Sequence, residues 1–289
     1  MSNDKSIVQE QKLSNDESIV ITRNGKHQYK FHRVFDMTKG RTADSELMPG
    51  VTTLAKHVGG DNFSIAMNWG LKQVRRSALL RLGVDADSLD SKEFKKAWES
   101  VKDNQFLTSD MEAPANRSQA QTASGNLLHE DIDAYIKDGT IPPEDHDLFM
   151  LWHRELGSRN YVSSEQFVVH EAMSYGGTVD AISKEADGYT LWDWKTKEAD
   201  SFNKYGNYPN EFAQIAAYVQ ALRRTKHPYA PVKAYIANIM RDGSAIHVVP
   251  VDLDHGGRLF LTGYNMYHTI RDGEGKSGDR IPKVVTSYD

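Results

Sequence analysis

Runs of apolar and β-branched residues predict five strands in the second half of the chain. They cover residues 164–170, 180–182, 190–195, 232–240 and 246–251. Asp187-Gly188 follows the second run and Asp242-Gly243 follows the fourth, and Asp-Gly pairs are typical of hairpin turns. A further hairpin is predicted over residues 19–34, around Asn24-Gly25.

Apolar residues at helical spacing predict helices before, between and after these strands. They cover residues 63–101, 119–138, 145–159, 210–223 and 254–271. Residues 84–115, which alternate acidic and basic side chains, are expected to be an insertion of short helices. This order of elements predicts an α/β fold, with a central mixed β-sheet flanked by helices and an additional N-terminal helical part.

The expected organisation has four parts. Residues 1–20 are expected to be a polar tail or a leading strand, since they are polar and too short to make a core. Residues 21–118 hold the hairpin and the N-terminal helical region, residues 119–275 hold the sheet and its helices, and residues 276–289 are a C-terminal tail.

The composition is that of an ordinary globular protein, with 289 residues and a formal net charge of −5. The chain has no cysteine, which excludes disulfides, thiolate catalysis and a cysteine-ligated iron–sulphur cluster. No apolar run is long enough to span a membrane. The polar N-terminus resembles neither a signal peptide nor a transit peptide, so a cytoplasmic protein is expected.

Charged residues interrupt the apolar strand over 190–195. Asp193 and Lys195 lie two residues apart and therefore share a face, while Trp192 and Trp194 point to the other side, towards the predicted core. Charge between such neighbours is costly unless it is used. The alternative is a surface hairpin with solvated charges, and the surrounding tryptophans weigh against it.

Asp180 joins this face if its strand pairs with the next one about Asp187-Gly188. That turn places Asp180 opposite Lys195, and Asp193 opposite Ile182. Two carboxylates are natural ligands for a hard cation such as Mg²⁺, which can polarise a phosphate and activate a bound water. Lys195 can hold or deprotonate that water, or neutralise charge on the phosphate. The three residues predict a metal-dependent phosphodiesterase.

Four short motifs resemble those of the PD-(D/E)xK nuclease superfamily. They are Gly125-x-x-x-His129, Gly177-x-x-Asp180, Asp193-Trp194-Lys195-Thr196 and Gln214-x-x-x-Tyr218. The chain is most similar to the branch that contains the RecB nuclease domain and the mitochondrial genome maintenance exonuclease, with phage-encoded relatives. The resemblance covers residues 49 to about 240 and implies a restriction-endonuclease-like core.

The resemblance implies a metal site. His129, Asp180, Asp193 and the main-chain carbonyl of Trp194 would hold one or two Mg²⁺ or Mn²⁺ ions, and imidazole is a better ligand for manganese than for magnesium. Asp133, one helical turn after His129, is expected to orient the imidazole by accepting its second N–H.

Three further residues are expected beside the metal ligands. Glu165 is predicted to support the ligands from behind or to pair with a basic residue. Gln214 and Tyr218 are placed by the resemblance at the edge of the site, where they would contact the DNA backbone or support Lys195.

DNA contacts are predicted at four places, because basic side chains suit phosphates and tyrosine rings stack on bases. The residues are Thr52; Lys72, Arg75 and Arg76; Arg117 and Gln121; and Lys204, Tyr205 and Tyr208. Three of these groups have a plainer explanation as well. Thr52 or Thr53 can cap a helix, the basic cluster suits a solvated helix face, and residues 200–210 suit an ordered surface loop.

The expected function is therefore hydrolysis of DNA from its ends, with single-stranded DNA as the expected substrate. The setting would be replication, recombination, repair or phage DNA processing, with recombination or replication proteins as possible partners. One alternative is a structure-specific endonuclease of the same superfamily. The other is a non-catalytic DNA-binding protein on a nuclease fold, against which the intact set of His129, Asp180, Asp193 and Lys195 weighs.

Overall fold

The computed structural model describes residues 6–14, 16–35, 41–58, 62–101, 106–143 and 145–274. The chain divides into two compact units. The first unit comprises Met1–Gly59 and Leu128–Asp289, and the second comprises Gly60–Leu127. Within the described ranges, no helix is both long and apolar enough to cross a membrane. The predicted C-terminal tail over 276–289 lies outside the described residues.

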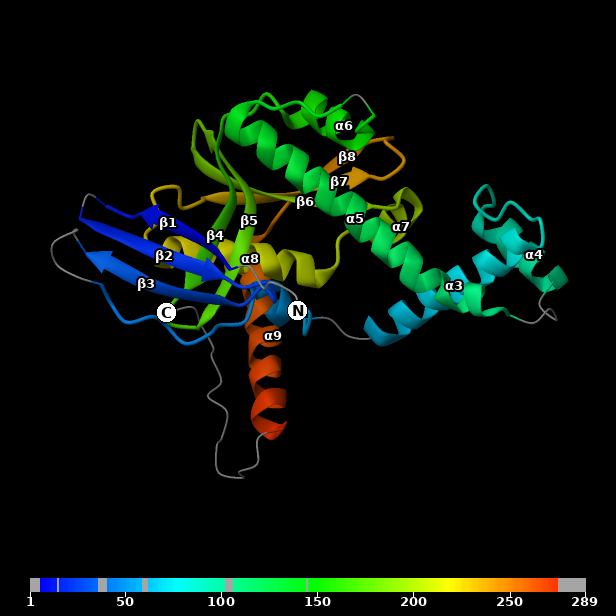
Figure 1. Cartoon of the computed structure of the whole chain (residues 1–289), viewed down its shortest axis with the longest axis horizontal. Coiled ribbons are helices and arrows are strands. Elements are labelled where there is room, and N and C mark those ends of the chain that lie inside the picture. The colour runs from blue at the N-terminus through cyan, green and yellow to red at the C-terminus, as the bar shows by residue number, and fades with distance from the viewer. Residues whose placement is uncertain are drawn as a thin grey trace. The chain divides into compact units, whose positions relative to one another are not determined.

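A five-stranded mixed sheet forms the centre of the first unit, with the strand order β4-β5-β6-β7-β8 (Figure 1). Its strands are β4 (Tyr161–His170), β5 (Tyr175–Glu185), β6 (Gly188–Lys197), β7 (Lys233–Met240) and β8 (Ile246–Pro250). Only β6 and β7 pair in parallel, and helix α8 (Pro209–Arg224) supplies the long connection that a parallel pair requires.

Apolar cores on both faces of this sheet explain why helices cover it. On one face, α2 (Val51–Ala55), α8 and α9 (Leu253–Glu274) pack against β4–β7. On the other, α6 (Asp147–Leu156) and the C-terminal part of α5 (Thr108–Asp138) cover Trp192 and Trp194. The predicted α/β fold, with a mixed sheet flanked by helices, is confirmed, and it is consistent with a restriction-endonuclease-like fold.

A second sheet of three antiparallel strands lies beside β4 in the first unit (Figure 1). Its strands are β1 (Ile7–Lys12), β2 (Glu17–Arg23) and β3 (Tyr29–Phe35). Ile19 and Ile21 of β2 are buried with Phe167 and Val169 of β4. The predicted hairpin around Asn24-Gly25 is therefore present. The polar tail expected over residues 1–20 is not what the described residues form, because β1 and the start of β2 belong to this sheet.

The second unit contains α3 (Asn62–Arg81), α4 (Ser91–Val101) and residues 108–127 of α5. A long helix thus begins at Thr108 rather than at the predicted residue 119. It ends at Asp138. The next residue, Gly139, has a φ of +78°, a left-handed conformation that glycine adopts without strain.

The turn between β5 and β6 differs from the predicted one. Glu185 pairs with Gly188 and Ala181 with Trp192, so the turn residues are Ala186 and Asp187. Gly188, with a φ of +134°, is the first residue of β6 instead of a turn residue. The predicted pairing is therefore wrong by two residues. Because side chains alternate between the two faces of a strand, a shift of two residues leaves each side chain on its predicted face.

Two smaller elements also differ from the predictions. Residues 199–205 form a short helix, α7 (Ala199–Tyr205), where a loop was expected. Helix α2 has Gly50 at its N-cap and no capping side chain, so neither Thr52 nor Thr53 caps it.

Candidate active site

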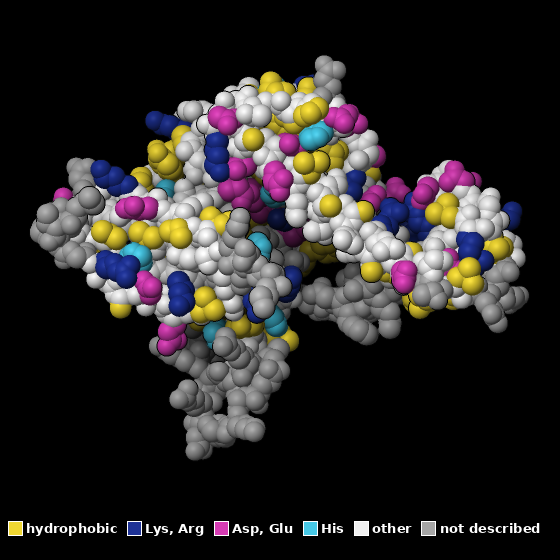
Figure 2. Space-filling view, in the orientation of Figure 1, with side chains coloured by type: hydrophobic (Ala, Val, Ile, Leu, Met, Phe, Trp, Pro, Cys, Tyr) yellow, Lys and Arg dark blue, Asp and Glu magenta, His cyan; other side chains and the backbone are white. Residues whose placement is uncertain are grey.

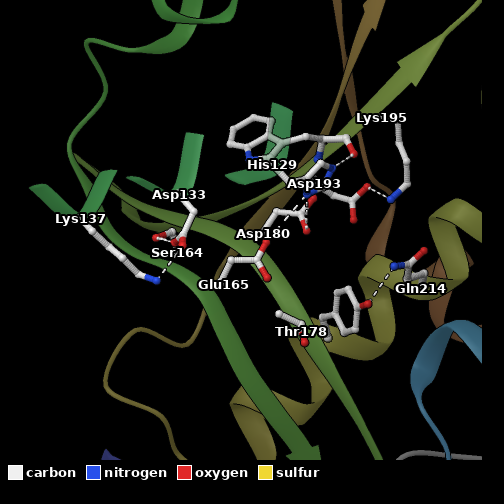
Figure 3. Close-up of polar contacts among 12 residues, drawn as sticks. His129, Asp133, Lys137, Ser164, Glu165, Thr178, Asp180, Asp193, Lys195 and Gln214 are labelled. Carbon is white, nitrogen blue, oxygen red and sulfur yellow. Dashed lines mark hydrogen bonds and ion pairs between the residues drawn. The ribbon is translucent and has the colours of Figure 1, made fainter. Parts of the chain in front are cut away.

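Asp180 and Asp193 enter the site from neighbouring strands, β5 and β6. Counted from the turn, the β5–β6 ladder ends at the pair Ala181–Trp192. Asp180, which precedes Ala181 in the chain, lies just beyond the last pair. Oδ2 of Asp180 then accepts a hydrogen bond of 2.7 Å from the main-chain N–H of Trp194. The Asp180 side chain thus takes the place of a backbone acceptor where the strands separate, which fixes its carboxylate beside β6 (Figure 3).

Lys195 pairs with Asp193 on the same strand. Nζ of Lys195 lies 2.5 Å from Oδ2 of Asp193, and the Lys195 side chain is about a quarter exposed. Asp193 is only 1% exposed; its Oδ2 is paired with Lys195, and its Oδ1 has no hydrogen-bond partner among the described residues. A buried carboxylate with free lone pairs is costly unless a cation completes its surroundings.

His129 of α5 faces the two strands. Its Nε2 lies 3.2 Å from the main-chain carbonyl oxygen of Trp194, so in the neutral imidazole Nε2 carries the proton. Its Nδ1 lies 3.5 Å from Oδ1 of Asp180 and 3.8 Å from Oε1 of Glu165. The lone pair of the neutral ring therefore points towards two carboxylates, as a metal-ligating nitrogen would.

The electrostatics of the site reflect burial and mutual charge. Burial lowers the pKa of His129, but the carboxylate of Asp180 and the hydrogen bond with Glu165 outweigh this and raise it to about 9. Burial raises the pKa of Asp193 to about 6, against the opposing charge of Lys195. Burial also raises the pKa of Asp180, and the nearby carboxylates raise the pKa of Lys195 despite its burial. All four groups therefore hold their protons more strongly than usual. This indicates a site that favours added positive charge, such as that of a metal ion.

Ligand atoms of His129, Glu165 and Asp180 all lie within 4.8 Å of one another. Separations of 3.5 and 3.8 Å around Nδ1 fit two ligands of one cation with bond lengths of about 2.1 Å. Together with the unbonded Oδ1 of Asp193, this donor set fits a divalent metal ion. The structure thus adds Glu165 to the predicted ligands, and it places the predicted ligand oxygen of Trp194 next to Nε2 of His129.

Glu165 enters the ligand group because of its backbone. Its φ is +46°, an unusual value for a residue other than glycine, and it sits within β4. Sequence patterns show no signal for such a local conformation. Asp133, in contrast, does not reach His129. It accepts hydrogen bonds from Ser164 Oγ at 2.5 Å and Lys137 Nζ at 2.7 Å (Figure 3), so its predicted role in orienting the imidazole is wrong.

Gln214 and Tyr218 of α8 lie at the edge of the site. Nε2 of Gln214 donates a 2.8 Å hydrogen bond to the hydroxyl of Tyr218. Burial raises the pKa of Tyr218 well above its usual value, and the nearby Tyr29 and the charges of Asp193 and Asp180 add to this. Gly177 of β5 makes room for the ring, because a Cβ there would lie 2.3 Å from Cε1 of Tyr218.

A polar network continues the site along β6. Lys197, two residues after Lys195, forms an ion pair with Glu211 of α8. Glu211 also accepts hydrogen bonds from Asn207 Nδ2 at 2.8 Å and from the main-chain N–H of Tyr208 at 2.9 Å. This network holds the start of α8 against β6. Its residues, apart from Tyr208, were not singled out by the sequence, because no motif marks them.

The predicted DNA contacts on α3 interact with other residues of the second unit. Lys72 Nζ lies 5.9 Å from the ring centroid of Phe94, and Arg75 Cζ lies 5.5 Å from that of Trp98. Arg76 pairs with Asp87. The first two contacts join α3 to α4, and the third joins α3 to the segment before α4. Arg117 and Gln121 lie on the part of α5 that belongs to this unit.

The predicted DNA contacts of the first unit differ from one another in their surroundings. Tyr205 on α7 is 60% exposed, and Lys204 Nζ lies 5.0 Å from its ring centroid. The ring of Tyr208, the N-cap residue of α8, has Lys197 Nζ 4.9 Å from its centroid. Thr52 is exposed on α2. Lys and Arg side chains are scattered over the visible face of this unit instead of forming a continuous stripe (Figure 2).

Comparison with known proteins supports the superfamily expected from the motifs. Residues 146–256 match the family model described as "PD-(D/E)XK nuclease superfamily". This segment contains all five strands of the central sheet, together with Asp180, Asp193 and Lys195. No curated protein matches the chain.

One similar solved structure is described as "Crystal structure of SSO0001", with 16% sequence identity and a TM-score of 0.26. The match covers 46% of this chain and 58% of that one. This chain therefore aligns with little more than half of the solved chain.

Proposed function

We propose that this chain is a metal-dependent nuclease that hydrolyses DNA from its ends. The observation that carries the proposal is the gathering of His129, Glu165 and Asp180 around one point, beside the buried pair of Asp193 and Lys195. The family match supports the nuclease class, while the choice of an exonuclease acting on single-stranded ends rests on the resemblance of the four motifs to the RecB-like branch.

A divalent cation, when bound, would neutralise charge on the scissile phosphate and make a bound water more acidic. His129 would hold it through Nδ1, and Asp180 and Glu165 through carboxylate oxygens. Asp193, whose buried Oδ1 has no hydrogen-bond partner among the described residues, is the fourth residue suited to hold it.

Lys195 has a separate role in the proposal. Its ammonium is fixed 2.5 Å from Asp193, and the side chain remains partly accessible to a substrate. From this position it would donate hydrogen bonds to the attacking water or to an oxygen of the phosphate. Gln214 and Tyr218 would contact the DNA backbone at the edge of the site, where their side chains are hydrogen-bonded to each other.

The experiment that tests the proposal compares linear and circular single-stranded DNA, with Mg²⁺, Mn²⁺ or a chelator. We expect loss of the linear DNA only with metal, and we expect the circle to persist. A label at either end gives the direction of digestion. Cutting of the circle would replace the exonuclease with an endonuclease, and the absence of cleavage under every condition would contradict the nuclease proposal.

A further inference from the structure

Glu165 adopts a conformation that it would not hold by itself. Its φ of +46° lies in the left-handed region, which costs a residue with a side chain free energy unless its surroundings impose it. Its neighbours in β4 are in ordinary register, with Ser164 paired to Ala181 and Gln166 paired to Val179. The distortion is therefore local, and it accompanies the approach of the Glu165 carboxylate to His129.

Gln9 of β1 holds the backbone directly after the φ torsion of Glu165. Its side-chain Nε2 donates a hydrogen bond of 2.7 Å to the carbonyl oxygen of Glu165. Its Oε1 accepts one of 2.7 Å from the N–H of Phe167. β4 is an outer strand of the central sheet, so these backbone groups face away from β5. One side-chain amide thus supplies the donor and the acceptor that a neighbouring strand would otherwise provide.

A second tether acts on the residue before Glu165. Oγ of Ser164 donates to Asp133 of α5, the helix that also carries His129. Gln11 of β1 also contacts β4, but its Nε2 donates to the carbonyl oxygen of Phe167, two residues beyond Glu165. The two glutamines therefore both join β1 to β4, and only one of them acts on the conformation of Glu165.

We propose that Gln9 is a positioning residue for the metal site, and that the N-terminal three-stranded sheet sets the geometry of Glu165 through it. The inference rests on the proposed function, because it takes Glu165 as a ligand of the divalent cation. Without the clamp, Glu165 relaxes towards the extended backbone of the rest of β4, and its carboxylate turns away from Nδ1 of His129. Partners that orient metal ligands typically change metal affinity by about tenfold or more when they are removed.

The test is Mn²⁺ binding by the full-length chain, measured from the electron paramagnetic resonance signal of free Mn²⁺. The variants are Gln9→Met and Gln11→Met, which keep side-chain length but lose the amide, together with Glu165→Ala and the double variant Gln9→Met/Glu165→Ala. Thermal unfolding without metal shows whether each variant folds. If Gln9→Met does not fold, Gln9→Asn, whose shorter amide cannot reach both backbone groups, serves in its place.

We expect Gln9→Met to weaken Mn²⁺ binding about tenfold, and Gln11→Met to leave it unchanged even where it lowers the melting temperature. In the Glu165→Ala background, Gln9→Met should have no further effect on binding, since it acts through Glu165. Equal effects of the two glutamine variants, or an unchanged affinity in Gln9→Met, would overturn the inference. An unchanged Mn²⁺ affinity in Glu165→Ala would also overturn the inference, but the proposed nuclease would stand without Glu165 as a ligand. Failure of the unmodified chain to bind Mn²⁺ would contradict the proposed function itself.

Discussion

The main-chain N–H of Trp194 donates a hydrogen bond to Oδ2 of Asp180 at the point where β5 and β6 separate. The same carboxylate lies 3.5 Å, through Oδ1, from Nδ1 of His129. Asp180 therefore has two separable functions, which are to satisfy the backbone of β6 and to supply charge to the site. Substitutions that remove one function or both distinguish them.

Asp180→Asn keeps an oxygen for the Trp194 N–H and loses the charge, whereas Asp180→Ala loses both. We expect the asparagine variant to melt near the temperature of the unmodified protein. The alanine variant should lose about 1–3 kcal/mol of unfolding free energy, because a buried donor is left unsatisfied. Both should lose Mn²⁺ binding. Urea unfolding with metal titration checks this, and equal stability of the two variants would contradict the structural role of the hydrogen bond.

Glu211→Gln breaks the ion pair between Glu211 and Lys197. Both of these side chains are mostly buried. Because the lysine then keeps its charge without a partner, the unfolding free energy should fall by about 2–4 kcal/mol. The double variant Lys197→Met/Glu211→Gln removes the orphaned charge and should recover part of the loss. Chemical denaturation of Glu211→Gln, Lys197→Met and the double variant measures this. If the double variant is as unstable as the sum of the single variants, the pair is not coupled as the structure indicates.

Gly177→Ala should destabilise the first unit, because a Cβ would lie 2.3 Å from the ring of Tyr218. Overpacking of this kind costs about 1–3 kcal/mol. The displaced ring should also lose its hydrogen bond to Gln214. In a Tyr218→Ala background the same substitution has room, so its cost should nearly vanish. Thermal unfolding of the four combinations is the measurement, and a full cost without the ring would show that another contact excludes the methyl group.

His170 and His227 should make the fold less stable in mild acid. The pKa of both is lowered to about 4, by burial in His227 and by burial together with the charge of Arg224 in His170. In the unfolded chain they bind protons near pH 6.5, so stability is fully present above that pH and is lost as the pH falls towards 4. The loss should be on the order of 1–3 kcal/mol for each histidine. Denaturation at pH 7 and pH 4.5 checks this.

His227→Asn provides the control for this pH effect, since asparagine retains an acceptor for the Tyr229 N–H that His227 now binds at 3.1 Å. Its stability should fall less between the two pH values than that of the unmodified chain. An unchanged pH dependence would show that His227 does not contribute to it.

The sequence was sufficient for the architecture and for the central strand of the site. Alternation of charged residues with Trp192 and Trp194 identified which side of β6 is core, and both tryptophans are buried there. The turn was misplaced by two residues, because Gly188 belongs to β6, but side-chain alternation has a period of two and tolerated the error. His129 was identified by the resemblance to the PD-(D/E)xK nuclease motifs, and not by the pattern of apolar and polar residues.

Other parts of the site depend on structure that no local pattern encodes. Glu165 reaches His129 through a left-handed backbone that Gln9, 156 positions earlier, supports. The basic residues of α3 are spaced like a phosphate-binding face, yet Arg75 and Lys72 pack on aromatic rings of α4. Composition also suggested a loop before α8, where residues 199–205 are helical because the turn-forming residues lie mostly after them.

The central claim is that the site built on His129, Asp180, Asp193 and Lys195 hydrolyses DNA with a divalent metal. The most direct test is digestion of end-labelled linear single-stranded DNA with Mn²⁺, comparing the unmodified chain with Lys195→Met purified in the same way. The account predicts chelator-sensitive digestion by the unmodified chain and a loss of at least about 100-fold in Lys195→Met, whose melting temperature should stay close to that of the unmodified chain. Equal digestion by the two proteins would contradict the assignment of this site.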